Sequence, residues 1–433
     1  MIIRGGSVVT PEATFTADIA VEDSRIAAIA PELPREREEI DASGLHVLPG
    51  VIDVHVHFNE PGRADWEGAA TGSRALAAGG GTAFFDMPLN SSPCTIGGAE
   101  FDAKRAALEQ ESITDFALWG GIVRGNHDQL AELAARGVIG FKAFMADSGL
   151  PEFPRADDRT LYDGMREAAR LGLPVAVHAE NNDLVQFSAG GPLPRNTIRD
   201  YLDSRPVLAE VEAIQRAALL AREAGARLHI VHISSARGVA AALEARAKGA
   251  DITLETCAHY LYFTDADMER LGAVLKCAPP LRPETLPLDG IDIVASDHSP
   301  ALPSMKESAN FSKVWGGVAG VQHTLPVVLG KTGAQAAAAL LAANPARRFA
   351  LQRKGRIAVG YDADFALVDL AARHTVTPES LFQRHGFSPY IGETFRCMVR
   401  RTILRGQTIF ADGKIAAQSC GRMLEHAKTG LHP

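Results

Sequence analysis

The segment of residues 51–62 reads VIDVHVHFNEPG, a branched apolar run that ends in two histidines, His55 and His57. The run predicts a β-strand over residues 51–56. Because residues i and i+2 of a strand point to the same face, the two imidazoles project into one space and form a ready pair of metal ligands. An isolated H-x-H pair is equally typical of ordinary surface or core histidines, so the rest of the sequence has to decide between these interpretations.

After this segment, strand-like and helix-like patterns alternate, which is typical of parallel βα units. Eight strands are predicted, at residues 51–56, 82–86, 116–121, 138–144, 174–178, 228–233, 252–256 and 291–296. Eight parallel strands that alternate with helices predict an α/β fold, the (β/α)8 TIM barrel. The competing open, doubly wound sheet would carry a glycine-rich phosphate loop after its first strand, and the histidine pair stands there instead.

The two ends of the chain follow a different pattern. Residues 1–49 read as short strands without a long helix, and strand patterns return at residues 355–370 and 394–410. The first end looks too short to close a core alone, so the two ends are expected to pair. We predict a small β-sandwich domain formed by residues 1–49 plus 351–433, with the barrel inserted between them at residues 50–350.

Composition narrows the function classes. The 433 residues include 44 basic and 52 acidic side chains, a net charge of −8, without a basic stripe. Nucleic acid and anionic membranes are therefore poor partners. No apolar run is long enough to span a bilayer, and the first residues lack the apolar core of a signal peptide. Five scattered cysteines form no C-x-x-C pair, which favours reduced thiols and a cytoplasmic protein.

The predicted strand ends carry the residues that could do chemistry. Active-site residues of such barrels come from the carboxyl ends of the strands. The candidate metal ligands at these ends are His55, His57, Lys142, His178, His232 and Asp297. Nitrogen and oxygen donors of this kind suit zinc, and also manganese, iron or cobalt. They are too many for one tetrahedral ion, so two ions that share a hydroxide, about 3.5–4 Å apart, fit better.

Three other residues, His229, His259 and Lys142, need a separate interpretation. His229 lies three residues before His232, so in a regular strand it points to the opposite face, and we expect a structural role between strand and helix. His259 follows the seventh strand and stays open between a structural role and a site role. Lys142 alone would be a costly buried lysine, and two metal cations would repel its ammonium. It makes sense in this site only if its charge is changed.

Five short motifs occur at the strand ends: HVH at residues 55–57, GFKAF at 140–144, HAE at 178–180, HISS at 232–235 and SDHSP at 296–300. Together they resemble the cyclic-amide branch of the amidohydrolase superfamily, which includes dihydroorotases, hydantoinases and allantoinases. The resemblance covers nearly the whole chain. It implies that Lys142 is carbamylated and bridges two divalent metal ions, and that the protein is a homo-oligomer, a tetramer or a dimer. The superfamily also contains inactive scaffold paralogues that lose ligands, whereas every ligand position is filled here.

The residues around the histidine pair separate the groups of this branch. Dihydroorotases typically read H-x-H-x-R, in which the arginine binds a substrate carboxylate, whereas Asn59 stands at that position here. Residues 55–68, 86–90, 276–282 and 315–320 resemble the allantoinases, whose substrate is a neutral ring with a ureido arm. The resemblance implies that Asp297 passes a proton from the hydroxide to the leaving nitrogen. It also implies substrate contacts from Asn59, Asn90, Arg63, Ala278 and Gly316.

Two alternatives remain at this stage. Arg63 could supply a positive charge from a new position, which would allow a dihydroorotase, and a hydantoinase or dihydropyrimidinase would use the same chemistry on another cyclic amide. Residues 301–312 depart from the allantoinase pattern at Ala301-Leu302-Pro303. This loop is expected to border the site, so it bears on the choice of substrate.

Overall fold

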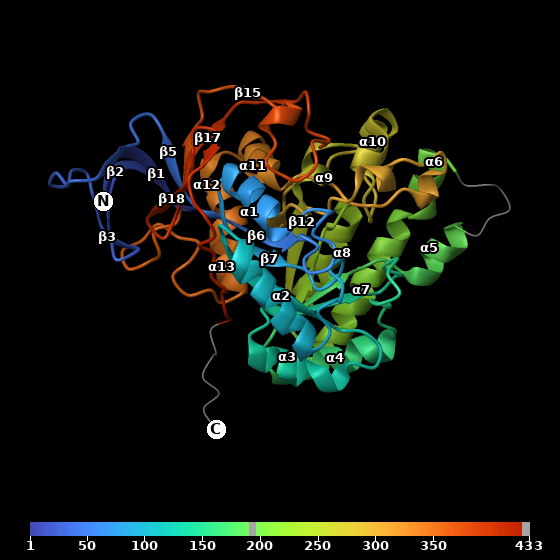
Figure 1. Ribbon diagram of the computed structural model, residues 1–433. Helices are drawn as coiled ribbons and strands as arrows, with labels where there is room; N and C mark the ends of the chain where they lie inside the picture. The colour runs from blue at the N-terminus through green and yellow to red at the C-terminus, as the bar shows by residue number, and fades with distance from the viewer. Residues whose placement is uncertain (190–195, 427–433) are drawn as a thin grey trace.

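The computed structural model describes residues 1–189 and 196–426 (Figure 1). Eight strands, hydrogen-bonded in chain order, form a parallel sheet at its centre. A bridge between Val56 and His298 joins the first strand to the segment after the eighth, so the sheet is nearly closed into a barrel. The strands are β6 (Val51–Val56), β7 (Gly81–Asp86), β8 (Asp115–Gly121), β9 (Gly140–Phe144), β10 (Val175–His178), β11 (Leu228–Ile230), β12 (Ile252–Cys257) and β13 (Ile293–Ala295).

Helices cover the outside of this barrel (Figure 1). They pack against it through small apolar residues at helical spacing: α7 buries Ala209, Ala213, Ala217 and Ala221, each four residues from the next. The helices up to β13 are α1 (Ala69–Ala78), α2 (Gly98–Glu111), α3 (Leu130–Arg136), α4 (Asp158–Arg170), α5 (Asn182–Ala189), α6 (Ile198–Ser204), α7 (Val207–Ala224), α8 (Ala236–Ala247), α9 (Ala258–Tyr262) and α10 (Asp265–Leu271). Those after β13 are α11 (Thr324–Thr332), α12 (Ala334–Ala338), a π-helical turn (Ala339–Ala343) and α13 (Asn344–Arg348).

The predicted (β/α)8 barrel is confirmed, and the first predicted strand coincides with β6. Two differences bear on the site. Strand β11 ends at Ile230, three residues before the predicted end, so His232 lies in the following loop. Helices α5 and α6, which the sequence did not predict, stand between β10 and α7 and border the mouth of the barrel.

Both ends of the chain contribute to one nine-stranded mixed sheet beside the barrel, at the left of Figure 1. This sheet has its own apolar core, which includes Val8 and Ile19 from the first end and Phe365 and Ile403 from the second. The predicted pairing of the two ends is therefore confirmed, while the domain limits at residues 49/50 and 350/351 stay a prediction. The strands are β1 (Ile2–Val9), β2 (Thr14–Glu22), β3 (Arg25–Ala30), β4 (Glu39–Asp41), β5 (His46–Pro49), β14 (Phe365–Asp369), β17 (Met398–Leu404), β18 (Gln407–Ala411) and β19 (Lys414–Ile415). A separate pair, β15 (His374–Thr375) and β16 (Thr394–Phe395), lies above it.

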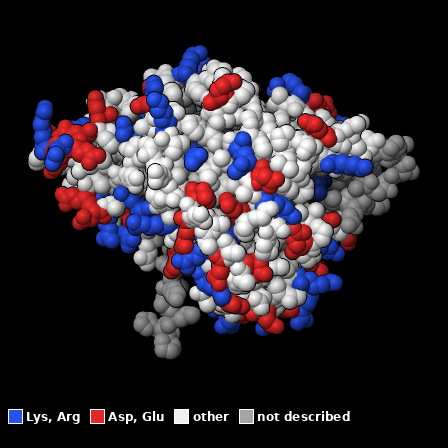
Figure 2. Space-filling view, in the orientation of Figure 1, with Lys and Arg blue, Asp and Glu red and all other residues white. Residues whose placement is uncertain are grey.

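Acidic and basic side chains are interspersed over the face of the molecule in Figure 2. Among the described helices, none combines the length and apolar character that a membrane span requires. The barrel interior is filled by apolar side chains such as Phe85, Trp119 and Phe349. The polar residues at the carboxyl ends of the strands therefore sit above a packed base.

Candidate metal centre

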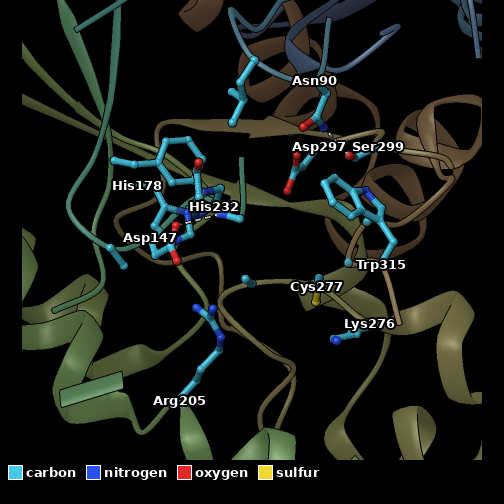
Figure 3. Close-up of a pocket in the computed structure, with 18 of the residues that line it drawn as sticks. Asn90, Asp147, His178, Arg205, His232, Lys276, Cys277, Asp297, Ser299 and Trp315 are labelled. Carbon is cyan, nitrogen blue, oxygen red and sulfur yellow. Dashed lines mark hydrogen bonds between the residues drawn. The ribbon is translucent and has the colours of Figure 1, made fainter. Parts of the chain in front are cut away.

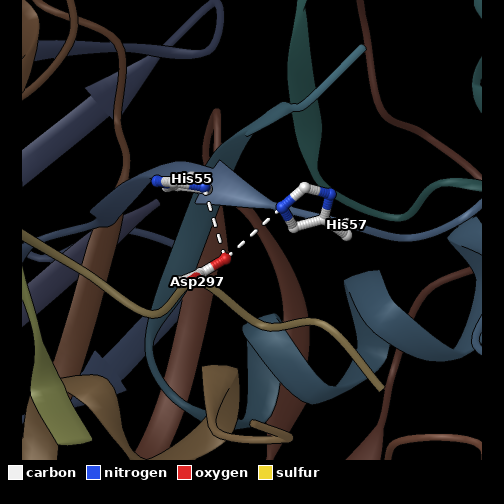
Figure 4. A group of neighbouring side chains, drawn as sticks. All are labelled: His55, His57 and Asp297. Atoms are coloured by element: carbon white, nitrogen blue, oxygen red, sulfur yellow. Dashed lines mark ion pairs between the residues drawn. The ribbon is translucent and has the colours of Figure 1, made fainter. Parts of the chain in front are cut away.

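Two histidines and one carboxylate converge at the rim of the barrel (Figure 4). The Nε2 atoms of His55 and His57 each lie 3.3 Å from Oδ1 of Asp297. His55 and His57 leave the end of β6, and Asp297 follows β13, the neighbouring strand across the barrel closure. The two histidines thus face one space, as their i, i+2 spacing predicts.

A second pair of imidazoles stands beside this group. Nδ1 of His178 lies 3.0 Å from Nε2 of His232, and the ring centroids of His232 and His55 are 5.5 Å apart. Lys142 comes from β9 and is completely buried. Its Nζ has no hydrogen-bond partner among the described residues and lies 5.1 Å from the ring centre of Phe144. The six residues predicted from the sequence are therefore gathered on one rim.

Two buried glutamates orient the histidines from behind. Oε1 of Glu255 lies 2.8 Å from Nδ1 of His55, and Oε2 of Glu180 lies 2.8 Å from Nε2 of His178. Burial alone would raise the pKa of both carboxyl groups, but Arg205 and His178 beside Glu180, and His55 and His229 beside Glu255, lower it to about 2, so both are ionised acceptors. An ionised acceptor on one ring nitrogen leaves the opposite nitrogen with a free lone pair, which is the form that binds a metal.

The sequence did not identify these glutamates as functional. Glu180 belongs to the HAE motif, so alternation along the strand could have suggested that it accompanies His178. Glu255 is 200 positions from His55, and neither residue type nor local spacing relates the two. The carboxyl group of Glu255 also accepts from Nε2 of His229 at 2.9 Å and from the main chain of His232 at 3.2 Å.

Lys142 and Asp297 differ in how the surroundings affect the ionisation of their side chains. Burial lowers the pKa of Lys142 to about 8. For Asp297, burial alone would raise the pKa, but His55 and His57 hold it well below its usual range. Asp297 is therefore an anion at neutral pH, and Lys142 is a group whose buried charge has no compensating partner within hydrogen-bonding distance in the described part of the chain.

The predicted orientation of His229, between strand and helix, is wrong, while its structural role stays a prediction. This histidine pairs across the sheet with Ala176, a residue of the barrel interior, and its ring stacks parallel to that of Trp119. It therefore points into the barrel rather than between strand and helix. The alternation failed because β11 ends at Ile230 and His232 takes a left-handed backbone conformation (φ 40°), which turns the later histidine inward as well. His259 is buried on α9, where burial lowers its pKa to about 4, and its role stays open.

Four of the residues predicted for the site have positive φ angles: Asn59, Asn90, His232 and Asp297, at 65°, 70°, 40° and 46°. Non-glycine residues rarely adopt this conformation, which costs about 1–3 kcal/mol and persists where the surroundings enforce it. These conformations bend the chain in the segments that follow strands β6, β7, β11 and β13.

A cavity of about 460 Å3 opens above these residues (Figure 3). Its lining includes Asn90, Ala278 and Gly316 from the predicted substrate-contact set, together with His55, His57, His178, His232 and Asp297. Arg205, Lys276 and Trp315 also line it. Figure 3 shows Lys276 and Trp315 on the side opposite His178 and His232, whereas Arg205 pairs with Glu180, the partner of His178. Sequence reasoning did not select these three residues, which lie on loops and a helix end rather than at strand ends.

Two predicted substrate-contact residues are placed behind the cavity. Asn59 is fully buried, and its amide nitrogen donates to the carbonyl oxygen of Pro300 at 3.2 Å. Arg63 donates to the carbonyl oxygen of Asn90 at 3.1 Å and to Glu152 at 2.6 Å. Neither is among the described residues that line the cavity. In this structure they contact residues beside it, and their direct contact with substrate stays a prediction.

The donors at the rim fit a metal centre. Imidazole nitrogens and carboxylate oxygens that approach one another across a polar space, with carboxylates fixing the outer ring nitrogens, are the ligands of zinc and related divalent ions. A (β/α)8 barrel with this centre at its carboxyl rim defines the class of metal-dependent barrel hydrolases.

Comparison with known proteins agrees with this class. The model of the Amidohydrolase family matches residues 46–409. A protein of Solibacter usitatus named allantoinase is 61% identical, over 100% of this chain and 99% of its own length. A Rubrobacter xylanophilus protein of the same name is 52% identical, over 98% of this chain and 97% of its own. The chain belongs to the amidohydrolase family and, within it, to the allantoinases.

Solved structures give the same picture. The L-hydantoinase (dihydropyrimidinase) of Arthrobacter aurescens superposes with a TM-score of 0.93 at 31% identity, covering 98% of this chain and 99% of its own. A dihydropyrimidinase from Brevibacillus agri gives a TM-score of 0.90 at 28% identity, covering 98% of both chains. The barrel and the mixed sheet are thus common to enzymes named for different cyclic substrates, so substrate choice has to reside in the lining of the cavity.

Proposed function

We propose that this protein is a binuclear metal-dependent allantoinase, a hydrolase of cyclic amide C–N bonds that converts allantoin and water to allantoate. The observation that supports the chemistry is the convergence of four histidines, Asp297 and the unpartnered Lys142 on one rim. The observation that supports the substrate is the full-length similarity to proteins named allantoinase.

The residues divide into two ligand groups. His55, His57 and Asp297 would hold one divalent ion, and His178 and His232 a second, since their ring nitrogens face each other. Lys142, as a carbamate, would be shared by both, which would replace a costly buried ammonium by an anion between cations. Zinc suits this donor set best, and cobalt, manganese or iron can use the same ligands.

Bound metal ions of this kind supply Lewis acidity towards a ring carbonyl and lower the pKa of a water molecule. The protein residues then have separate tasks. Asp297, kept ionised by His55 and His57, accepts the proton of the attacking water and passes it to the leaving ring nitrogen. Glu255 and Glu180 hold the histidine rings in orientation.

Substrate orientation falls to the cavity lining. Asn90 and the main chain near Ala278 and Gly316 would hydrogen-bond the ring and its developing oxyanion. Arg63 donates to the carbonyl oxygen of Asn90, and Asn59 donates to that of Pro300. Both would therefore support this part of the cavity lining, or contact a substrate that extends beyond it. The five free cysteines favour a cytoplasmic location. This location and a tetrameric or dimeric assembly stay predictions.

The test is kcat/KM of the purified protein on racemic allantoin, hydantoin and dihydroorotate, with zinc and bicarbonate supplied. We expect allantoin to exceed the other two by orders of magnitude. If dihydroorotate is preferred, Arg63 serves as a substrate cation and the allantoin proposal fails. If all three are inert although metal is bound, the substrate is another cyclic amide.

A further inference from the structure

Two lysines beside the cavity, the buried Lys276 and the half-buried Lys306, donate to main-chain oxygens instead of to carboxylates. Nζ of Lys276 lies 2.7, 3.2 and 2.6 Å from the carbonyl oxygens of Phe311, Ser312 and Val314. Nζ of Lys306 lies 3.3, 3.0 and 2.7 Å from those of Ala273, Trp315 and Gly317. Five of these six oxygens belong to one short segment, residues 311–317, which we call the cavity wall.

The cavity wall has little regular structure, so its carbonyl groups depend on such donors. It contains one 3-10 turn, Phe311–Lys313, and its members from Ser312 to Gly317 line the cavity. Buried main-chain oxygens without partners are costly, and the two ammonium groups satisfy those that the turn leaves over. Lys276 also anchors the carboxyl end of the cavity wall through its main chain, because the N–H of Gly317 donates to the carbonyl oxygen of Lys276 at 2.6 Å.

The position of the wall is tightly defined. Gly317 has a φ of 138°, and a Cβ atom there would stand 2.0 Å from the carbonyl oxygen of Ser299. Ser299 follows Asp297 by two residues, so the wall lies directly against the segment that carries the candidate catalytic carboxylate. Loosening the wall would therefore change the cavity beside Asp297.

Placing two lysines here has a cost. Lys276 is buried and stacks over Tyr201 with 4.6 Å from Nζ to the ring centre, and burial lowers the pKa of Lys306 further than that of Lys276. Methionine would fill a similar volume without an unpaired charge. A pair of lysines whose donors go mostly to the cavity wall points to a role in shaping the cavity.

We propose that Lys276 and Lys306 are positioning residues that clamp the cavity wall, and that residues 312–315 of this wall, beside the ring contact at Gly316, recognise the substituent of the substrate ring. This proposal rests on the proposed function. Figure 3 shows Trp315 and Lys276 on the side of the cavity opposite His178 and His232. A ring held at the histidines would therefore direct its substituent towards the wall. Peptide N–H and C=O groups complement a ureido arm, which carries both donors and acceptors.

The test compares Lys306→Met and Lys276→Met with wild type, all loaded with zinc. For each protein, kcat and KM are measured on allantoin and on hydantoin, which lacks the ureido arm. We expect KM for allantoin to rise, and the ratio of kcat/KM for allantoin to that for hydantoin to fall at least tenfold, with unchanged metal content. Lys331→Met, at an exposed lysine of α11, is the matched control and should keep the wild-type ratio.

A second measurement makes the clamp visible without catalysis. Hydrogen–deuterium exchange at residues 311–317 should accelerate in both methionine variants, and ethylammonium should restore slow exchange and the substrate ratio in Lys306→Ala. If exchange accelerates while the ratio is unchanged, the lysines are structural only and the proposal is overturned. If Lys306→Met does not fold, Lys306→Arg replaces it and should keep the ratio within threefold; a tenfold loss there would overturn the proposal.

The two levels of failure can be told apart. If wild type does not hydrolyse allantoin, the proposed function fails, while the exchange data on the cavity wall still decide whether the clamp exists. If wild type hydrolyses allantoin and both variants keep its ratio and its exchange rates, only the clamp fails.

Discussion

Lys142 and Lys354 are both buried lysines, 0% and 4% exposed, at opposite ends of the same barrel. Lys354 lies at the amino ends of the strands, where its Nζ meets Asp115 at 2.8 Å, Asp364 at 2.7 Å and Asp362 at 3.1 Å. Lys142 lies at the carboxyl ends, and its Nζ has no hydrogen-bond partner in residues 1–189 or 196–426.

The difference between them has a chemical meaning. Burial alone would lower the pKa of Lys354, but Asp364 and Asp115 raise it above its ordinary value. The pKa of Lys142 is lowered by burial to about 8, without a hydrogen-bonded carboxylate to reverse the shift. Removing one member of a complete set of buried charges destabilises a fold, because the remaining partners are left without their counter-charge. A buried amine without hydrogen-bond partners at the rim where such barrels carry their active sites supports the proposal that Lys142 takes part in the chemistry.

The largest expected effect comes from removing the unpartnered lysine. Lys142→Met should lower kcat/KM for allantoin by at least about 10^3-fold, because a metal centre supplies several kcal/mol of stabilisation to the transition state. The melting temperature of the metal-free protein should stay equal or rise, because no partner loses its charge. Steady-state kinetics and calorimetry measure these two quantities.

Chemical rescue separates the carbamate from a simple amine at this position. In Lys142→Ala, short carboxylates such as acetate should restore part of the activity by replacing the oxygens of the proposed carbamate. Near wild-type activity of Lys142→Met without added carboxylate would show that this lysine takes no part in the centre.

The paired lysine should behave in the opposite way. Lys354→Met leaves Asp364 buried without its cation and Asp115 with Arg405 alone, so the free energy of unfolding should fall by about 3–5 kcal/mol. The folded fraction should retain kcat/KM within about twofold, since Lys354 is remote from the rim. Denaturant unfolding, followed at the same time as activity, measures both.

The control for this variant is Lys248→Met, which breaks an exposed pair with Glu244 of 2.6 Å and should cost less than about 1 kcal/mol. A loss of activity in folded Lys354→Met would contradict the division of the barrel into a structural and a chemical end.

The contrast also explains what could be predicted from the sequence. The strand ends were accessible because H-x-H, GFKAF and SDHSP each end a strand-like run, and parallel strands bring their ends to one rim. The orientation of His229 was not accessible, because the left-handed conformation of His232 breaks the alternation on which that prediction relied. Asn59 and Arg63 were assigned by position in a motif, and position does not say whether a side chain faces a cavity or its supporting wall.

Long-range partners were the other gap. Glu255 serves His55 from 200 positions away, and Lys354 reaches Asp115 across 239. A local pattern contains no signal for either contact. Both are buried ionic contacts, and only the folded chain shows which one supports the chemistry and which one supports the fold.

An intermediate effect is expected from the carboxylate behind His55. Glu255→Gln keeps the size of the side chain but weakens the orientation of the ring, so metal affinity should fall by about 10–100-fold. Competition with a chromophoric chelator measures it. Glu210→Gln is the control: Glu210 is also a buried glutamate, but it accepts from Ser234 and Ser235 rather than from a histidine. Equal losses in both variants would mean that general destabilisation, not ring orientation, lowers the affinity.

The smallest effect is expected for Lys276 and Lys306, whose ammonium groups donate only to carbonyl oxygens. They are intermediate between Lys142, which has no hydrogen-bond partner in the described part of the chain, and Lys354, which has carboxylate partners. Burial, with the charge of Lys276 nearby, lowers the pKa of Lys306 to about 7, and burial with Arg205 lowers that of Lys276 to about 8. As pH rises from 7 to 9, both lose their protons, and a neutral amine donates more weakly to the cavity wall. KM for allantoin should therefore rise about two- to fivefold over this interval, as expected when hydrogen bonds of about 1 kcal/mol are weakened.

The effect of rising pH on the free energy of unfolding is favourable, whereas its effect on KM is unfavourable, and this difference makes the contribution of the two lysines recognisable. The pKa of each lysine is lower in the folded chain than the ordinary 10.5, so between pH 7 and 10 the unfolded chain binds more protons than the folded one. By linkage, these groups make the free energy of unfolding increase with pH in that window. We therefore expect KM to worsen while the contribution of the lysines to stability improves. In Lys306→Met both slopes should be smaller than in wild type; identical pH profiles of KM in the two proteins would assign the change to other groups of the site.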